Sequence, residues 1–139
     1  MILACRDERK ASEAVEHIKR STNNQRVEFM QLDLSSFEST RAFVAAFAAR
    51  RIPLHALISN AGLAPVSFNL GPDGYEQTWT VNHLSSFLLV RLMLPLLAAQ
   101  SDIDSRIVMV NSGSHRIAWG ISISIYLSLG IVPNVSIMA

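Results

Sequence analysis

The first helix that the hydrophobic pattern predicts covers residues 9–20. Ala11, Val15 and Ile18 recur there at helical intervals among charged side chains, and Asp7 stands where a helix cap is expected. Such a segment places one apolar stripe against a core and keeps its charges in water. We therefore expect an amphipathic surface helix.

A second helix is predicted to begin at Ser35. Ser35 and Glu38 have the spacing of a capping box, in which each side chain binds the other residue's backbone N–H. Phe43 and Phe47 follow one turn apart and supply an apolar stripe. This helix is expected to pack that stripe on the protein core.

The third predicted helix, residues 75–99, has a different pattern. Its second half is apolar nearly all round, with Arg91 as the exception. A helix without a polar face has to be covered on most sides. Asn82 lies in the helix interior, where asparagine is unfavourable, so we expect it to have a structural or functional role.

Short apolar runs predict strands at residues 27–34, 54–58 and 106–110, and the chain opens in a strand that ends near Cys5. Strands that alternate with helices of this length indicate a parallel sheet with crossover connections. Ligands of such α/β proteins bind beyond the carboxyl ends of the strands, so we expect the chemistry there.

Composition excludes several classes of protein. The 139 residues include 12 Lys and Arg, 11 Asp and Glu, and one cysteine. Nucleic-acid binding needs basic residues concentrated on one face, which this balance does not supply. One cysteine permits no internal disulfide, and the four histidines lack metal-ligand spacing. We expect a cytoplasmic protein without a bound metal.

The C-terminal stretch, residues 117–139, contains no charged residue. It is long enough to span a membrane, but Gly, Ser, Pro and Asn interrupt it throughout, so we expect no membrane helix. The N-terminus also lacks the long apolar run of a signal peptide.

Five short motifs occur at the predicted strand ends and in the long helix: Ala-Cys-Arg-Asp at 4–7, Leu-Asp-Leu at 32–34, Ser-Asn-Ala-Gly at 59–62, Val-Asn-His at 81–83 and Asn-Ser at 111–112. In this order they resemble the short-chain dehydrogenase/reductase family, in particular its retinol-dehydrogenase-like branch. The resemblance covers residues 2–116 and implies an oxidoreductase with a nicotinamide cofactor.

The resemblance implies a cofactor contact for each matching residue. Arg6 would meet the adenosine 2′-phosphate, which favours NADP over NAD, and its forked guanidinium suits a phosphate. Asp33 would accept a hydrogen bond from the adenine amino group. Asn60, Ala61 and Gly62 would bring backbone close to the cofactor ribose, since Gly62 has no Cβ.

By the same resemblance, Ser112 would hydrogen-bond the reacting oxygen of an alcohol or carbonyl substrate, and Asn82 would anchor the water of a proton relay. In that mechanism a tyrosine transfers the proton while hydride moves to or from the nicotinamide, and a lysine lowers the tyrosine pKa. The implied partners are NADP and a small alcohol or carbonyl compound.

Most of these residues also have a simpler interpretation. Arg6 is suited to a solvated strand-to-helix turn, Asp33 to a turn before a helix, and Asn60 with Gly62 to the end of a strand. Serine after a strand is ordinary, so Ser112 has the least support of its own.

The sequence departs from the family at both ends. No glycine precedes Gly62, so the family's first strand and glycine-rich turn have no counterpart. Of the Tyr-x-x-x-Lys motif only Tyr126 is available, and Gly130 stands at the lysine position. We expect residues 1–116 to be an incomplete NAD(P)-binding Rossmann domain and residues 117–139 to be a tail outside the family.

The expected fold class is α/β, a partial Rossmann-type doubly wound parallel sheet whose central first strand is missing. The strand order 3-2-1-4-5-6 then leaves the second and fourth strands without their common neighbour. Residues 121–129 alternate apolar with mostly serine positions, so they have the pattern of a strand, although serine fits a central strand poorly.

Two functions are compatible with these observations. The chain is a fragment of an NADP-dependent short-chain dehydrogenase/reductase, or it is an inactive chain that docks on a partner or a second copy through the apolar helix at residues 87–97. Because the tyrosine–lysine pair and the glycine turn are missing, we expect no measurable turnover from these 139 residues alone.

Overall fold

The computed structural model of the protein describes residues 1–64, 67–99 and 105–112. Tyr126, Gly130 and the uncharged stretch at 117–139 lie outside these residues.

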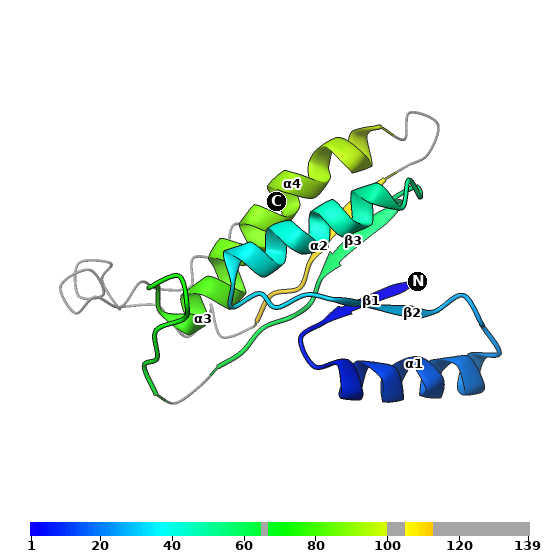
Figure 1. The fold of residues 1–139 in the computed structure, drawn as a ribbon, viewed down its shortest axis with the longest axis horizontal. Coiled ribbons are helices and arrows are strands. Elements are labelled where there is room, and N and C mark those ends of the chain that lie inside the picture. Colours follow the sequence, from blue (N-terminus) through cyan, green and yellow to red (C-terminus); the bar gives the residue numbers. More distant parts are fainter. Residues whose placement is uncertain (65–66, 100–104, 113–139) are drawn as a thin grey trace.

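Among the described residues, four short strands form two parallel pairs. β1 (Ile2–Cys5) pairs with β2 (Glu28–Gln31), and β3 (Ala56–Ser59) pairs with β4 (Arg106–Met109). No described strand joins the two pairs, which confirms the expected break in the sheet. All four strands run in the same direction, so their carboxyl ends lie at one end of the molecule (Figure 1).

Helices cover the strands from two sides (Figure 1). α1 (Glu8–Thr22) packs on β1 and β2. On the other side, α2 (Phe37–Ala49) packs against a longer helix that begins at Gln77. That long helix is continuous but has three parts: α3 (Gln77–Trp79), a π-helical turn η1 (Thr80–Leu84) and α4 (Ser85–Ala98).

One hydrophobic core lies between the strands and the α2–α4 layer. Ile2 and Ala4 of β1 pack against it, and so does Leu57 of β3. The core therefore holds both strand pairs in one layer, although backbone hydrogen bonds do not join them. Its buried members are Leu32, Leu34, Phe43, Phe47, Leu54, Val81, Leu89, Met93 and Leu97.

The opposite face of the β3–β4 pair is apolar and exposed. Ile58 is 63% exposed, Val108 44% and Val110 53%. Side chains alternate between the two faces of a strand, so these residues point away from the core that Leu57 contacts. No described helix covers this face.

The local sequence pattern predicted the N-terminal cap of α1 correctly but not that of α2. Asp7 caps α1 as expected, because its Oδ1 accepts from the Lys10 N–H at 3.0 Å. For α2 the expected capping box is wrong. The cap is Ser36, whose Oγ accepts from the Ser39 N–H at 3.2 Å, while the Ser35 hydroxyl donates to Asp33.

Strand β2 is shorter than the expected run at residues 27–34. It ends at Gln31 because the chain then turns, with the Ser36 N–H donating to the Asp33 carbonyl. The apolar residues after the turn, Leu32 and Leu34, enter the core without being part of the strand.

The apolar helix is covered on one side only. Leu89, Met93 and Leu97 are buried, whereas Phe87 is 56% exposed and Leu94 43%. Within this chain, the described residues therefore leave one side of the helix uncovered. By length and composition the segment Gln77–Ala98 could cross a membrane, a test that core helices also pass.

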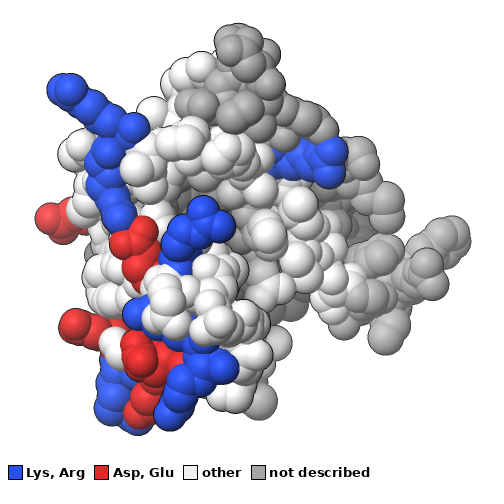
Figure 2. All heavy atoms as spheres, turned by 90° about the vertical axis from the view of Figure 1, so that its right-hand side faces the viewer, with Lys and Arg blue, Asp and Glu red and all other residues white. Residues whose placement is uncertain are grey.

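Charged side chains of both signs gather over α1 (Figure 2). Arg9 pairs with Glu13 at 2.7 Å and Lys19 with Glu16 at 3.3 Å along that helix. Exposed pairs of this kind contribute little to stability, about 0.3–0.5 kcal/mol each. The interspersed signs leave no large patch of one charge on the face in Figure 2.

Candidate functional site

The residues predicted for the site follow the carboxyl ends of the four strands. Arg6 follows β1, Asp33 lies two residues beyond β2, Asn60 follows β3, and Ser112 lies three residues beyond β4. Because β1 pairs with β2 and β3 with β4, these residues form two neighbouring pairs at the same end of the molecule (Figure 1). This is the end where α/β proteins bind ligands.

Arg6 lies in a turn that backbone contacts hold in place. Its carbonyl accepts from the Gln31 side chain at 3.0 Å, and the next residue, Asp7, caps α1. The Lys10 N–H lowers the pKa of Asp7 by binding its carboxylate, so this residue stays charged. The Arg6 guanidinium is exposed and makes no hydrogen bond or ion pair within the described ranges, which leaves it available to an anion.

Asp33 uses part of its carboxylate to shape its own turn. Oδ1 accepts from the Ser35 N–H at 2.8 Å and from the Ser35 hydroxyl at 2.7 Å. Its backbone N–H donates to Ser39 Oγ at 2.9 Å. Oδ2 accepts no hydrogen bond from the described residues, so a half-buried acceptor remains for a donor such as an amino group.

Asn82 holds the turn that contains Asn60, Ala61 and Gly62. Its Oδ1 accepts from the Leu63 N–H at 2.9 Å, and its Nδ2 donates to the Leu63 carbonyl at 2.8 Å. A Cβ on Gly62 would lie 3.4 Å from Asn82 Oδ1, at the limit of ordinary contact.

Leu63 is a site residue that the sequence did not reveal. It takes part through its backbone, so its side-chain type carries no signal. The unusual position of Asn82 in a helix interior was the one indication that a partner existed.

The π-helical turn places Asn82 for this contact. The Ser85 N–H donates to the Thr80 carbonyl five residues back, which widens the helix at this point. The Ser86 hydroxyl donates to the Val81 carbonyl at 3.1 Å and so replaces a partner lost from the α-helical ladder. Wide turns of this kind are frequent at functional sites.

Asn111 and Ser112 lie beside the Asn60 turn. The Val110 N–H donates to the Ser59 carbonyl at 2.9 Å, which ties the ends of β3 and β4 together. Asn111 and Ser112 are exposed at this strand end. The structure thus brings Ser112 to the same strand pair as Asn60, although the two come from segments far apart in the sequence.

Other candidates do not add to the site. His83 stacks on Trp79 with ring centroids 4.3 Å apart, which gives it a structural contact within the helix. In the described part of the chain, no group of three His, Cys, Asp or Glu side chains is placed to hold a metal ion.

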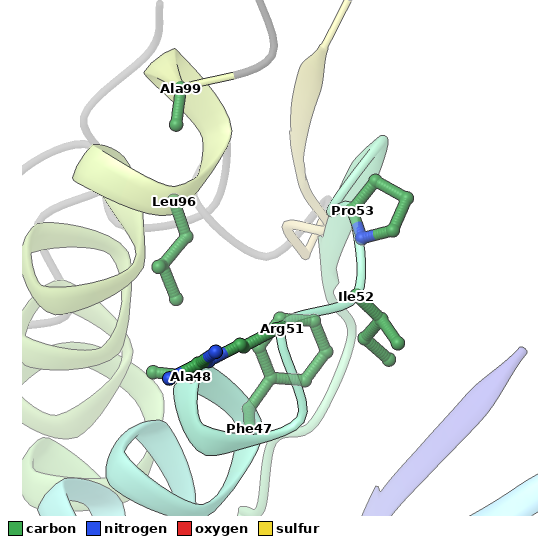
Figure 3. A pocket seen from close by; sticks show the side chains of 7 residues that line it. All are labelled: Phe47, Ala48, Arg51, Ile52, Pro53, Leu96 and Ala99. Atoms are coloured by element: carbon green, nitrogen blue, oxygen red, sulfur yellow. The ribbon is translucent and has the colours of Figure 1, made fainter.

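A hollow of about 490 Å³ lies at the other end of the molecule. The last turns of α2 and α4 and the loop before β3 line it, and Arg51 is the one charged residue among them (Figure 3). The strand carboxyl ends are elsewhere, so this hollow is separate from the candidate site.

Comparison with known proteins identifies the family of the chain. The family model of short chain dehydrogenases matches residues 1–126. The chain therefore belongs to the short-chain dehydrogenase family, as the five motifs predicted, and its α/β fold is that of the family.

Individual proteins of known sequence or structure are similar to most of this chain. The chain is 41% identical over 116 residues to human WW domain-containing oxidoreductase, covering 84% of this chain and 28% of that protein. It is 42% identical over 115 residues to human retinol dehydrogenase 11, covering 83% and 36%. A short-chain dehydrogenase from Escherichia coli CFT073, solved in complex with NADPH, aligns with a TM-score of 0.65 and 28% identity, covering 87% of this chain and 50% of that one.

The chain thus spans 28% and 36% of the lengths of these two human relatives.

Proposed function

We propose that this chain is the central piece of an NADP-dependent short-chain dehydrogenase/reductase, which transfers hydride between nicotinamide and an alcohol or carbonyl substrate. The observation that carries the proposal is the pairing of β1 with β2. It places the unengaged Arg6 guanidinium and the Asp33 carboxylate after neighbouring strands.

These residues fit the adenosine half of the cofactor. Arg6 would bind the 2′-phosphate with its forked donors, and Asp33 Oδ2 would accept from the adenine amino group. The exposed turn of Asn60, Ala61 and Gly62 would lie along the ribose, held there by the contacts of Asn82 with Leu63. The described residues contain no glycine-rich turn for the pyrophosphate.

The reacting end of the site would involve the β3–β4 pair. The nicotinamide, when bound, supplies the acceptor or donor of hydride. Ser112 would hydrogen-bond the substrate oxygen, and Asn82 would position the neighbouring turn and the water of the proton relay. The described residues contain no Tyr-x-x-x-Lys motif that could exchange the proton with the substrate.

Cofactor preference tests the role of Arg6. In the native protein, Arg6→Ala removes a charge-assisted contact worth about 1.5–3 kcal/mol, so the KM for NADPH should rise about tenfold to a hundredfold while the KM for NADH stays the same. Arg9→Ala is the matched control, because Arg9 is exposed nearby in the first turn of α1 and pairs with Glu13. Equal effects of Arg6→Ala on the two cofactors would contradict the proposal.

A second function is favoured by the outer face of α4. Phe87 and Leu94 are exposed there on either side of Arg91, seven residues apart and so on one side of the helix. Exposed apolar side chains of this kind indicate a contact surface. We propose that residues 87–97 join two copies of the chain, whether or not the protein is catalytic.

Sedimentation velocity tests this contact. Phe87→Ser should shift the protein from dimer to monomer, whereas Phe68→Ser, at an exposed phenylalanine outside α4, should leave the distribution unchanged. An unaltered distribution for Phe87→Ser would remove this surface from consideration.

We also propose a cytoplasmic location. It is supported by the burial of Leu89 and Met93 in the core, which gives the apolar helix a role inside the protein. Fractionation of cells that contain the native protein should find it with soluble markers, and recovery with membranes would contradict this location.

A further inference from the structure

A loop after β3 docks on the first turn of α2. Asp73 Oδ2 accepts from the Phe37 N–H at 2.8 Å, across 36 positions of sequence. The Tyr75 ring lies on Phe37, with ring centroids 5.8 Å apart. This loop, residues 69–77, follows β3 of one strand pair, whereas α2 follows β2 of the other. It therefore connects two parts of the molecule that no shared sheet connects.

The docking loop has a fixed shape of its own. The Gly71 N–H donates to the Tyr75 carbonyl at 2.8 Å, and the Gln77 N–H donates to the Asn69 carbonyl at 2.8 Å. Gly74 adopts φ +80°, a conformation that a side chain would disfavour. Because the loop is closed by these bonds, a displacement of Asp73 is transmitted to the residues that follow Tyr75.

Those residues begin the long helix. Both carboxylate oxygens of Glu76 accept backbone N–H groups, from Thr78 at 2.9 Å and from Trp79 at 2.7 Å. The Glu76 carbonyl accepts from the Thr80 N–H and hydroxyl. Two residues further on, Asn82 reaches Leu63. A series of hydrogen bonds, linked by short backbone segments, thus runs from α2 to the turn after β3.

We propose that Asp73 is a positioning residue, which sets the helix that carries Asn82 relative to α2 and the Asp33 turn before it. Asp73 would then fix the spacing between the adenosine contacts after β2 and the Asn82–Leu63 contacts after β3. This consequence for cofactor binding rests on the proposed function, whereas the mechanical coupling does not.

Amide hydrogen exchange of the 139-residue chain, without cofactor, measures the coupling. Asp73→Ala should accelerate exchange of the Leu63 N–H by at least about tenfold, because the series then loses its anchor on α2. Asp73→Asn keeps an oxygen that can accept from Phe37, so it should restore the rate to within about twofold of the unmodified chain. Ser36→Ala is the matched control, since it removes the helix's own cap and should accelerate only the first turn of α2.

The Met93 N–H, deep in the core, reports global unfolding in the same samples. Acceleration at Leu63 with little change at Met93 supports the proposal. An unchanged rate at Leu63, an equal acceleration at Met93, or the same effect from Ser36→Ala would overturn it. An NADPH titration of the native protein separates the two claims, because absence of binding would count against the proposed function and leave the measured coupling in place.

Discussion

Asn82 shows how one residue can be both unusual in sequence and explained by structure. Asparagine is disfavoured inside a helix because its side chain competes for backbone groups. Here both polar atoms of the side chain are used, and they satisfy the N–H and the carbonyl of Leu63. The structure therefore adds a positioning role for Asn82 to the expectation of a relay water.

Asn82→Ala should lower the free energy of unfolding by about 1–3 kcal/mol, because two half-buried backbone groups lose their partners. Urea denaturation measures this loss. Asn24→Ala is a suitable control, since Asn24 is exposed and its side chain binds the Arg26 N–H locally. A loss for Asn82→Ala no larger than that of the control would show that water replaces the Asn82 side chain without cost.

Glu76 gives a pH-dependent contribution to stability. Partial burial raises the pKa of Glu76, but the N–H groups of Thr78 and Trp79 outweigh it, and the pKa lies below the ordinary value of 4.5. A lowered pKa in the folded state stabilises the fold fully above that ordinary value. The contribution of the Glu76 carboxylate to the free energy of unfolding is lost as the pH falls through the lowered pKa.

Glu76→Gln should therefore be less stable than the unmodified chain by about 1 kcal/mol at pH 7, since glutamine keeps one acceptor and no charge at the start of the helix. The difference should shrink as the pH falls below 4.5. Urea denaturation across this range measures it, and a difference independent of pH would contradict the role of the charge.

At the scale of elements, α2 and α4 pack through small buried polar residues as well as apolar ones. Thr40 of α2 and Ser85 of α4 have no exposed surface. Ser86 has hydrogen-bond partners in Val81 and Ser59, whereas Ser85 Oγ is buried without a partner among the described residues. The two adjacent serines should consequently respond differently to the same substitution.

Ser85→Ala should leave the free energy of unfolding unchanged or raise it by about 1 kcal/mol, because an unsatisfied hydroxyl is removed. Ser86→Ala should lower it by about 1 kcal/mol, because it removes the hydrogen bond of the Ser86 hydroxyl to the Val81 carbonyl. Thermal unfolding of the two variants makes the comparison, and equal losses in both would contradict the difference in hydrogen bonding.

Local sequence patterns were enough to predict the helices and strands. The caps and the contacts between distant segments depend on interactions that local patterns do not contain. Asp7 was identified as a cap because α1 has no competing residue before it. Ser35 and Ser36 are locally equivalent, and the bonds of Ser35 to Asp33 decided between them. The contact of Asp73 with Phe37 spans 36 positions, so no periodicity could reveal it. The same limit applies to Leu63, which contributes backbone alone.

At the scale of the whole molecule, the break between the strand pairs follows from topology. Strand order was predictable because the motifs assign each strand to a place in the family's sheet. The core spans the break, which explains how the two pairs keep one layer. The edge of β1 opposite β2 and the edge of β3 opposite β4 have no strand partner among the described residues.

Hydrogen exchange of the 139-residue chain tests this break. The Glu28 and Leu32 N–H groups donate to the carbonyls of Met1 and Cys5, so alternate residues of β1 face β2. The Leu3 N–H should be protected and the Ala4 N–H should exchange at least about tenfold faster. Equal protection at both positions would mean that a further strand pairs with β1.

The central claim is that this chain is the middle of a longer NADP-dependent enzyme. The most direct test is the intact mass of the native product, captured from its source with an antibody against residues 73–77. The account predicts a mass well above the 15.3 kDa of these 139 residues. A native product of 15.3 kDa would contradict it and would favour a chain that acts through the exposed face of α4.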